Sequence, residues 1–211
     1  MKLRKYIMIA ACAMALLTLP LEAKVVDIYD LSLDENLETP VIKNEKQALK
    51  IQDFQHKLAV SLIESNYDVE SMRDGEILVI TITSDQLFEP NDSVLTFHGK
   101  ELLKPMLKYL RNPGFYKMLL VMHSDNTGSE SYTMKMSCSR VNAVYDWFDA
   151  NGDVEYVVPY ALGSSEPYVK NDSMENRRKN RRLEIYLVPN TVMIEQAKRG
   201  KIIFNASNTK K

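Results

Sequence analysis

Residues 115–150 read FYKMLLVMHSDNTGSESYTMKMSCSRVNAVYDWFDA, and this stretch decides the fold. Its opening, residues 115–122, is a mostly apolar run that predicts a buried strand. A polar loop around Gly128 follows, and from about residue 132 to residue 150 apolar side chains recur at helical spacing. The expected inner face of this helix consists of Val141, Val144, Tyr145 and Phe148.

The same alternation of strands and helices continues on both sides of this stretch. Three more strands are predicted at residues 76–83, 154–162 and 182–188, and three more helices at residues 45–66, 102–110 and 173–180. Pro105 should kink the second of these helices or mark its effective start, because proline removes a helical hydrogen bond. The order predicts an α/β (α+β) fold, in which helices pack on a mixed β-sheet of about four strands.

The first 23 residues differ in composition from the rest of the chain. Lys2, Arg4 and Lys5 precede an apolar run at residues 7–19, which is typical of a signal peptide cleaved after Ala23. Lipidation at Cys12 is the less favoured alternative, because cleavage there leaves only about five apolar residues before the cysteine, fewer than an export signal needs. We therefore expect a periplasmic protein, associated with the outer membrane.

Beyond the signal peptide, the sequence predicts one globular domain with two flanking segments. Residues 24–44 lack sustained periodicity and are interpreted as an N-terminal arm or linker, with apolar residues that are able to dock on the domain. Residues 45–190 are interpreted as the domain, and residues 191–211 as a tail with a weakly helical stretch. Removing residues 1–23 takes away three basic residues and one acidic residue, so the net charge changes from −1 to −3. Nucleic acid is therefore not an expected partner.

Residues 122–144 carry polar and small residues at fixed spacings after the predicted strand. A Ser–Asp pair is followed by a glycine, a threonine, a Met–Ser pair, an arginine and a helical valine: Ser124, Asp125, Gly128, Thr133, Met136, Ser137, Arg140 and Val144. Two more patterns follow in order, a turn at residues 163–167 (GSSEP) and a charged stretch at residues 171–184 that contains NRRLE. Independent short matches seldom fall in sequence by chance.

These three motifs make residues 88–188, about half of the chain, similar to the C-terminal domain of the OmpA, Pal and MotB family. The resemblance implies non-covalent binding of peptidoglycan through the diaminopimelate residue of its stem peptide, held by Asp125 and Arg140. Such a peptide presents an ammonium group and carboxylates, which an aspartate and a forked arginine complement. Arg140 lies about two turns into its helix, so the Gly128 loop can bring both side chains to one pocket.

Four further residues complete the predicted ligand-binding set: Ser124, Gly128, Thr133 and Arg181. Arg181 and Arg182 each have a structural alternative, a charged edge or a pair with Glu184. Thr133 stands where the family has asparagine, and Met122 stands where it has glycine and has the bulk to narrow the site. These departures bear on affinity rather than on the class of ligand.

Catalysis is not expected. Cys138 and His123 are too weak a basis for a cysteine peptidase, because no supporting motif surrounds the cysteine. No cofactor or metal site is predicted, since His56 and His98 show no ligand-like spacing. The expected function is to anchor an envelope component, such as an outer-membrane or envelope-complex protein, to peptidoglycan. The alternative is an interaction subunit of an envelope complex in which wall binding is weak or lost.

Overall fold

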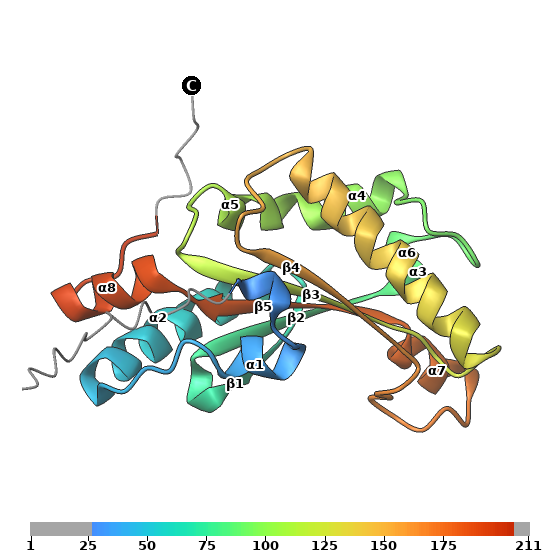
Figure 1. Cartoon of the computed structure of the whole chain (residues 1–211), viewed down its shortest axis with the longest axis horizontal. Coiled ribbons are helices and arrows are strands. Elements are labelled where there is room, and N and C mark those ends of the chain that lie inside the picture. Colours follow the sequence, from blue (N-terminus) through green and yellow to red (C-terminus); the bar gives the residue numbers. More distant parts are fainter. Residues whose placement is uncertain (1–26, 205–211) are drawn as a thin grey trace, which may run out of the picture.

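The computed structural model describes residues 27–204 and contains a five-stranded mixed sheet (Figure 1). The predicted signal peptide and Cys12 lie outside the described residues. The strands are β1 (Asp68–Met72), β2 (Ile77–Thr83), β3 (Tyr116–His123), β4 (Val157–Gly163) and β5 (Arg182–Pro189), in the spatial order β1-β2-β5-β3-β4. Only the β3–β4 pair is parallel among the four neighbouring pairs, and the predicted mixed α+β fold is confirmed.

β1 is a fifth strand that the sequence analysis did not predict. It is largely exposed, pairs only with β2, and connects to it through a turn at residues 73–75. Its sequence, DVESM, lacks the alternation of apolar and polar residues that marks a half-buried strand. The four strands that were predicted are the more apolar ones, because each is covered by other parts of the chain.

The helices agree with the predicted order, and two further short helices occur near the N-terminus and after β2. The helices are α1 (Leu33–Glu38), α2 (Glu45–Glu64), α3 (Ser84–Leu87), α4 (Phe97–Leu103), α5 (Leu107–Leu110), α6 (Glu130–Asp149), α7 (Met174–Asn180) and α8 (Thr191–Arg199). Pro105 interrupts the predicted helix at 102–110 with a 3-10 turn, Lys104–Met106, between α4 and α5. The weakly helical stretch in the tail is α8, which buries Met193 and Ala197. Within residues 27–204, no helix has both the length and the apolar character needed to cross a bilayer.

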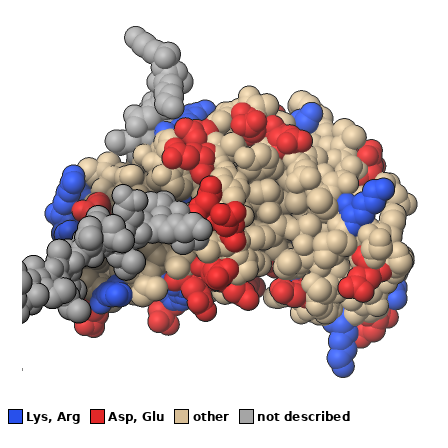
Figure 2. Space-filling model, viewed as in Figure 1, with Lys and Arg blue, Asp and Glu red and all other residues tan. Residues whose placement is uncertain are grey.

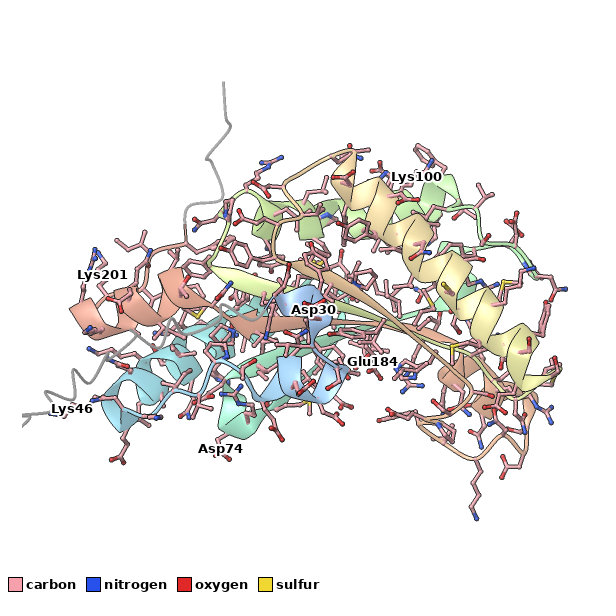
Figure 3. The ribbon with its side chains drawn as sticks, in the orientation of Figure 1. Asp30, Lys46, Asp74, Lys100, Glu184 and Lys201 are labelled. Carbon is pink, nitrogen blue, oxygen red and sulfur yellow. The ribbon has the colours of Figure 1, made fainter. Side chains whose placement is uncertain are left out.

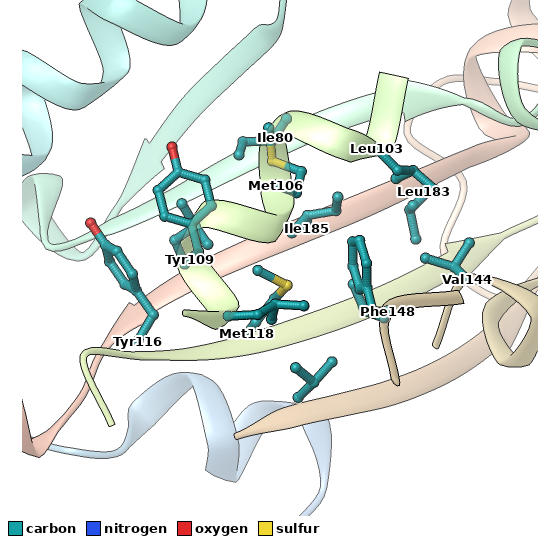
Figure 4. Packing of buried hydrophobic residues seen from close by; sticks show 14 of the residues in the cluster. Ile80, Leu103, Met106, Tyr109, Tyr116, Met118, Val144, Phe148, Leu183 and Ile185 are labelled. Atoms are coloured by element: carbon teal, nitrogen blue, oxygen red, sulfur yellow. The ribbon is translucent and has the colours of Figure 1, made fainter. Parts of the chain in front are cut away.

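One face of the sheet carries the main hydrophobic core. Leu183 and Ile185 of β5 meet Val144 and Phe148 of α6 there, and the 3-10 turn contributes Met106 (Figure 4). Helices α2 and α8 add side chains to the same core at its other end. The inner face that was predicted for α6 is only partly confirmed, because Tyr145 is half-buried while the other three residues are fully buried.

A short segment, residues 27–40, covers the opposite face of the sheet, and we call it the docked segment. Leu33 and Leu37 pack there on an apolar cluster formed by Ile77, Val79, Leu119, Val121, Val158, Tyr186 and Val188. Asn36 is fully buried, donating to the Tyr160 hydroxyl (2.6 Å) and accepting from the Lys117 ammonium (2.8 Å). Acidic side chains surround this middle part of the face (Figure 2).

Two cationic side chains, Lys117 and Arg73, bind the docked segment through hydrogen bonds. Lys117 donates to the Thr39 carbonyl (2.8 Å) as well as to Asn36, and Arg73 donates to the carbonyls of Leu37 (2.8 Å) and Pro40 (3.0 Å). Burial lowers the pKa of Lys117 to about 8, and the nearby positive charge of Arg73 adds to this shift. The docked segment is therefore held by charged hydrogen bonds as well as by apolar contact.

Candidate functional site

A cleft of about 450 Å³ opens where the loop after β3 meets α3, α6 and α7. Four of the predicted ligand-binding residues line it: Ser124, Asp125, Arg140 and Arg181. The other lining residues are Asp85, Phe88, Glu89, Pro90, Asn91, Thr127, Tyr132, Met136, Met174 and Arg177. The cleft therefore combines carboxylates, guanidinium groups and apolar side chains.

The loop between β3 and α6 sets the position of Asp125. The Asp125 carboxylate accepts the backbone N–H of Thr127 (2.7 Å), the local turn that aspartate favours. Gly128 then adopts a φ of +101°, where a side chain would be strained, and Ser129 caps α6 by accepting from the N–H of Tyr132 (3.2 Å). These contacts leave Asp125 buried at the base of the cleft, only 4% exposed.

Arg181 is the ion-pair partner of Asp125. Its Nη1 lies 2.6 Å from Asp125 Oδ2, and its Nε and Nη2 donate to the two oxygens of Asp85 at 3.2 and 3.0 Å. Burial alone would raise the pKa of Asp125, but the hydrogen bonds from Arg181 and Thr127 outweigh it and lower that pKa. Asp125 is therefore an ionised acceptor at neutral pH.

Arg140 is held differently, by a backbone carbonyl from another segment and by an aromatic ring. Its Nε donates to the Asp92 carbonyl (2.8 Å), and its Cζ lies 5.1 Å from the centroid of the Phe88 ring. Burial lowers the pKa of its guanidinium, which is 7% exposed. Among residues 27–204, its terminal nitrogens have no hydrogen-bond partner, so they are available to a ligand.

Thr133 and Gly128 line a neighbouring hollow of about 270 Å³ instead of the cleft. Thr133 and Arg140 share the buried face of α6, but seven residues of helix separate them by roughly 10 Å along the axis. The Thr133 hydroxyl donates to the Glu130 carbonyl (3.0 Å) and lies 3.4 Å from Ser164 Oγ. The structure thus brings four of the six predicted site residues together and places two beside them.

The lining residues that were not predicted as part of the site include Asp85, Phe88 and Arg177. Asp85 reaches it because the sheet order places α3 beside the start of β5, where the Ser84 N–H donates to the Arg181 carbonyl (2.8 Å). Arg177 lies in α7 one turn before Arg181, the residue that caps the C-terminal end of this helix, so the two are neighbours. Helical spacing from Arg181 could have identified Arg177 from the sequence, whereas the positions of Asp85 and Phe88 at the cleft follow only from the tertiary arrangement.

Four other residues that the sequence singled out, Met122, Arg182, His123 and Cys138, do not line the cleft. Met122 is fully buried in the main core and does not narrow the cleft. Arg182 pairs with Glu184 (2.7 Å), on the face of the sheet that also carries the docked segment (Figure 3). His123 Nε2 lies 3.3 Å from Glu184, whereas Cys138 is exposed on α6 and accepts a hydrogen bond from Asn142 (3.7 Å).

Known proteins are similar to part of this chain. The chain is 28% identical over 110 residues to outer membrane protein A of Bordetella avium, which covers 52% of this chain and 57% of that protein. It is 39% identical over 64 residues to the peptidoglycan-binding protein ArfA of Mycobacterium tuberculosis, covering 30% of this chain and 20% of that protein. The matched part thus spans little more than half of the first relative and a fifth of the second.

A solved structure gives the corresponding similarity in three dimensions. The cell wall anchor of the T6SS from Pseudomonas aeruginosa superposes with a TM-score of 0.54 at 27% sequence identity, covering 64% of this chain and 96% of that one. No family model matches the chain. The chain is nevertheless similar to these OmpA-like proteins both in sequence and in fold, as the motifs at residues 88–188 led us to expect.

Proposed function

We propose that this chain binds peptidoglycan non-covalently in the periplasm and ties an envelope component to the cell wall. The observation that carries the proposal is the cleft in which Asp125, an ionised acceptor, lies with Arg140, whose terminal nitrogens are free for a ligand. The diaminopimelate end of a stem peptide offers one ammonium and one carboxylate, which such a pair complements. The relatives include a peptidoglycan-binding protein and a cell wall anchor.

Each residue of the site has a distinct proposed role. Asp125 accepts from the ammonium group, Arg140 donates to the carboxylate, and Arg181 keeps Asp125 ionised and in place. Ser124 lines the cleft and offers a hydroxyl as donor or acceptor. Gly128 and Thr133 act on the ligand indirectly, by shaping the loop and the start of α6.

Co-sedimentation of the purified protein with isolated sacculi tests this function. Loss of one charge-assisted contact in Asp125→Ala or Arg140→Ala should weaken binding by about tenfold or more. Arg199→Ala is the matched control, because Arg199 is an exposed arginine at the end of α8 and does not line the cleft. Binding that is unchanged in both cleft variants contradicts the assignment.

The alternative envelope-complex role has its own outcome in the same experiment. If the wild-type protein does not sediment with sacculi, the fold acts as a protein-interaction module. We also infer that the chain is a binding protein and not an enzyme, since His123 is engaged by Glu184 and Cys138 is exposed elsewhere. Hydrolysis of wall fragments that disappears in Cys138→Ala would overturn this inference.

A further inference from the structure

The three guanidinium groups of the cleft differ in how fully they are used. Arg181 is saturated on both sides, since it donates two hydrogen bonds to Asp85 and one to Asp125. Asp85 also lies 3.6 Å from Arg178 at the rim. Asp85 and Asp125 therefore each already have an arginine partner.

Arg177 has no such partner although part of it is buried. Its Nε atom is buried, and within residues 27–204 it has no hydrogen-bond partner. A buried donor without an acceptor is costly, so native structures rarely retain one without a reason. Glu89, the remaining carboxylate that lines the cleft, is exposed, and it does not accept a hydrogen bond from the Arg177 Nε.

Arg177 and Arg140 approach the cleft from different elements. Arg140 comes from α6, while Arg177 comes from α7, where Met174, Arg177 and Arg181 share one side of the helix and all line the cleft. The free donors of the site therefore lie at two places, whereas the family pattern in the sequence accounts for one arginine contact. An occupant with a single carboxylate leaves one of the two arginines unused.

We propose that Arg177 is a second carboxylate-binding residue, which takes a carboxylate of the stem peptide other than the one beside the diaminopimelate ammonium. This inference rests on the proposed function. A stem peptide of alanine, γ-linked glutamate and diaminopimelate carries further carboxylates, on the α-carbon of the glutamate and at the C-terminal end. A planar guanidinium donates two hydrogen bonds to such a carboxylate in a forked geometry.

The consequence is selectivity for the charge state of the peptide. Many stem peptides differ only by amidation, which replaces a carboxylate with a neutral amide that cannot accept two strong bonds from an arginine. With Arg177 in the site, amidation of the partner carboxylate should weaken binding, while amidation elsewhere should not. The residue thus determines which chemical form of the wall peptide is held.

A double-mutant cycle between protein and ligand tests the pairing. Calorimetry would compare the full chain and its Arg177→Met variant, each with three synthetic tripeptides: the unmodified peptide, the peptide amidated at the glutamate α-carboxylate, and the peptide amidated at the C-terminal carboxylate. Coupling between two groups appears when their separate losses fail to add. Lys179→Met is the control, since it removes an exposed charge from the same helix outside the cleft.

The expected result is that one of the two amidations weakens binding to wild type by about tenfold, and that Arg177→Met has the same effect on the unmodified peptide. Combining the two changes should cost no more than either alone. A loss from amidation that persists in full in Arg177→Met, or no loss from amidation in wild type, overturns the role of Arg177 while peptide binding itself stands. If the wild-type protein binds none of the peptides, both the proposed peptidoglycan binding and this inference about Arg177 are wrong.

Discussion

Arg181 Nη1 lies 2.6 Å from Asp125 Oδ2, while Arg140, which is expected to hold the ligand together with Asp125, donates its Nε to the Asp92 carbonyl. The acceptor and the free donor of the cleft are therefore set by different neighbours. Asp125 is fixed through α7 and its own loop, and Arg140 through Phe88 and the segment after α3. Changes to the neighbours of Asp125 or of Arg140 should alter the site without removing either of the two groups that we propose to bind the ligand.

The first prediction concerns pH and Arg181. Arg181→Met removes the cation that lowers the pKa of Asp125 below its ordinary 3.8 and leaves the burial that raises it, so this pKa should rise. Wild-type binding should then persist as the pH falls towards 4, whereas binding by the variant should decline at higher pH. In the wild type, the stability that ionised Asp125 contributes is lost as the pH falls through its lowered folded-state pKa, and Arg181→Met should show less of this loss because it has less of that stability.

Sedimentation with sacculi across the acid range, together with an NMR titration of the Asp125 carboxyl, measures both shifts. Arg178→Met provides the comparison, since Arg178 contacts Asp85 but not Asp125. Identical acid limits for wild type and Arg181→Met would show that Arg181 does not control the ionisation of Asp125.

The second prediction concerns the ring beneath Arg140. Phe88→Leu removes the aromatic face 5.1 Å from Arg140 Cζ, an interaction worth about 1 kcal/mol at a partly buried site. Stem-peptide affinity should fall severalfold because the guanidinium is less well oriented. Stability should fall by about 1 kcal/mol, as is typical for a hydrophobic exchange in a core.

Phe148→Leu separates these two effects. Phe148 is also fully buried but belongs to the core under α6 and does not line the cleft. It should show a similar loss of stability in urea denaturation and wild-type affinity in calorimetry. Equal affinity losses in the two variants would mean that general loosening, and not the ring, affects the cleft.

The third prediction concerns Lys117 and alkaline pH. Its pKa is about 8 in the folded protein and 10.5 ordinarily, so burial of its charge costs stability below pH 8, and this cost is relieved as the pH rises towards 10.5. The full relief is on the order of 3 kcal/mol. Lys117→Met should lack this relief, so the stability difference between wild type and variant should grow in favour of wild type over that interval.

Urea denaturation of both proteins at several alkaline pH values gives this difference directly. Comparing the two proteins cancels the titration of the buried tyrosines, which is common to both. A difference that stays constant between pH 8 and 10.5 would contradict the burial of a charged Lys117.

The sequence predicted the parts of the fold that local patterns encode. Buried strands such as β3 and β5 have apolar side chains on both faces, so their runs stand out. β1 was not predicted, because an exposed edge strand has few apolar residues that would mark it as a strand. The docking of residues 27–40 depends on contacts between Asn36 and Lys117, 81 positions apart, which no local window contains.

In the candidate site, too, local patterns predicted some features, and contacts between distant segments determine the others. The motif spacing correctly brought Asp125 and Arg140 to one cleft, because a strand, a tight turn and two helical turns fix their relative positions. It did not show that Arg181 holds Asp125, since that contact joins residues 56 positions apart and depends on the order of β3 and β5. Thr133 was grouped with the cleft because motif spacing does not resolve two adjacent hollows on one helix.

The docked segment also determines how the domain should respond to mechanical force. If a ligand is held in the cleft while tension is applied at Asp27, the load reaches the docked segment before it reaches α2 or the sheet. The contacts of Asn36, Leu37, Thr39 and Pro40 with Lys117 and Arg73 then bear the pull first. We expect this segment to detach and lengthen the chain under load while β3, α6 and the cleft between them remain intact.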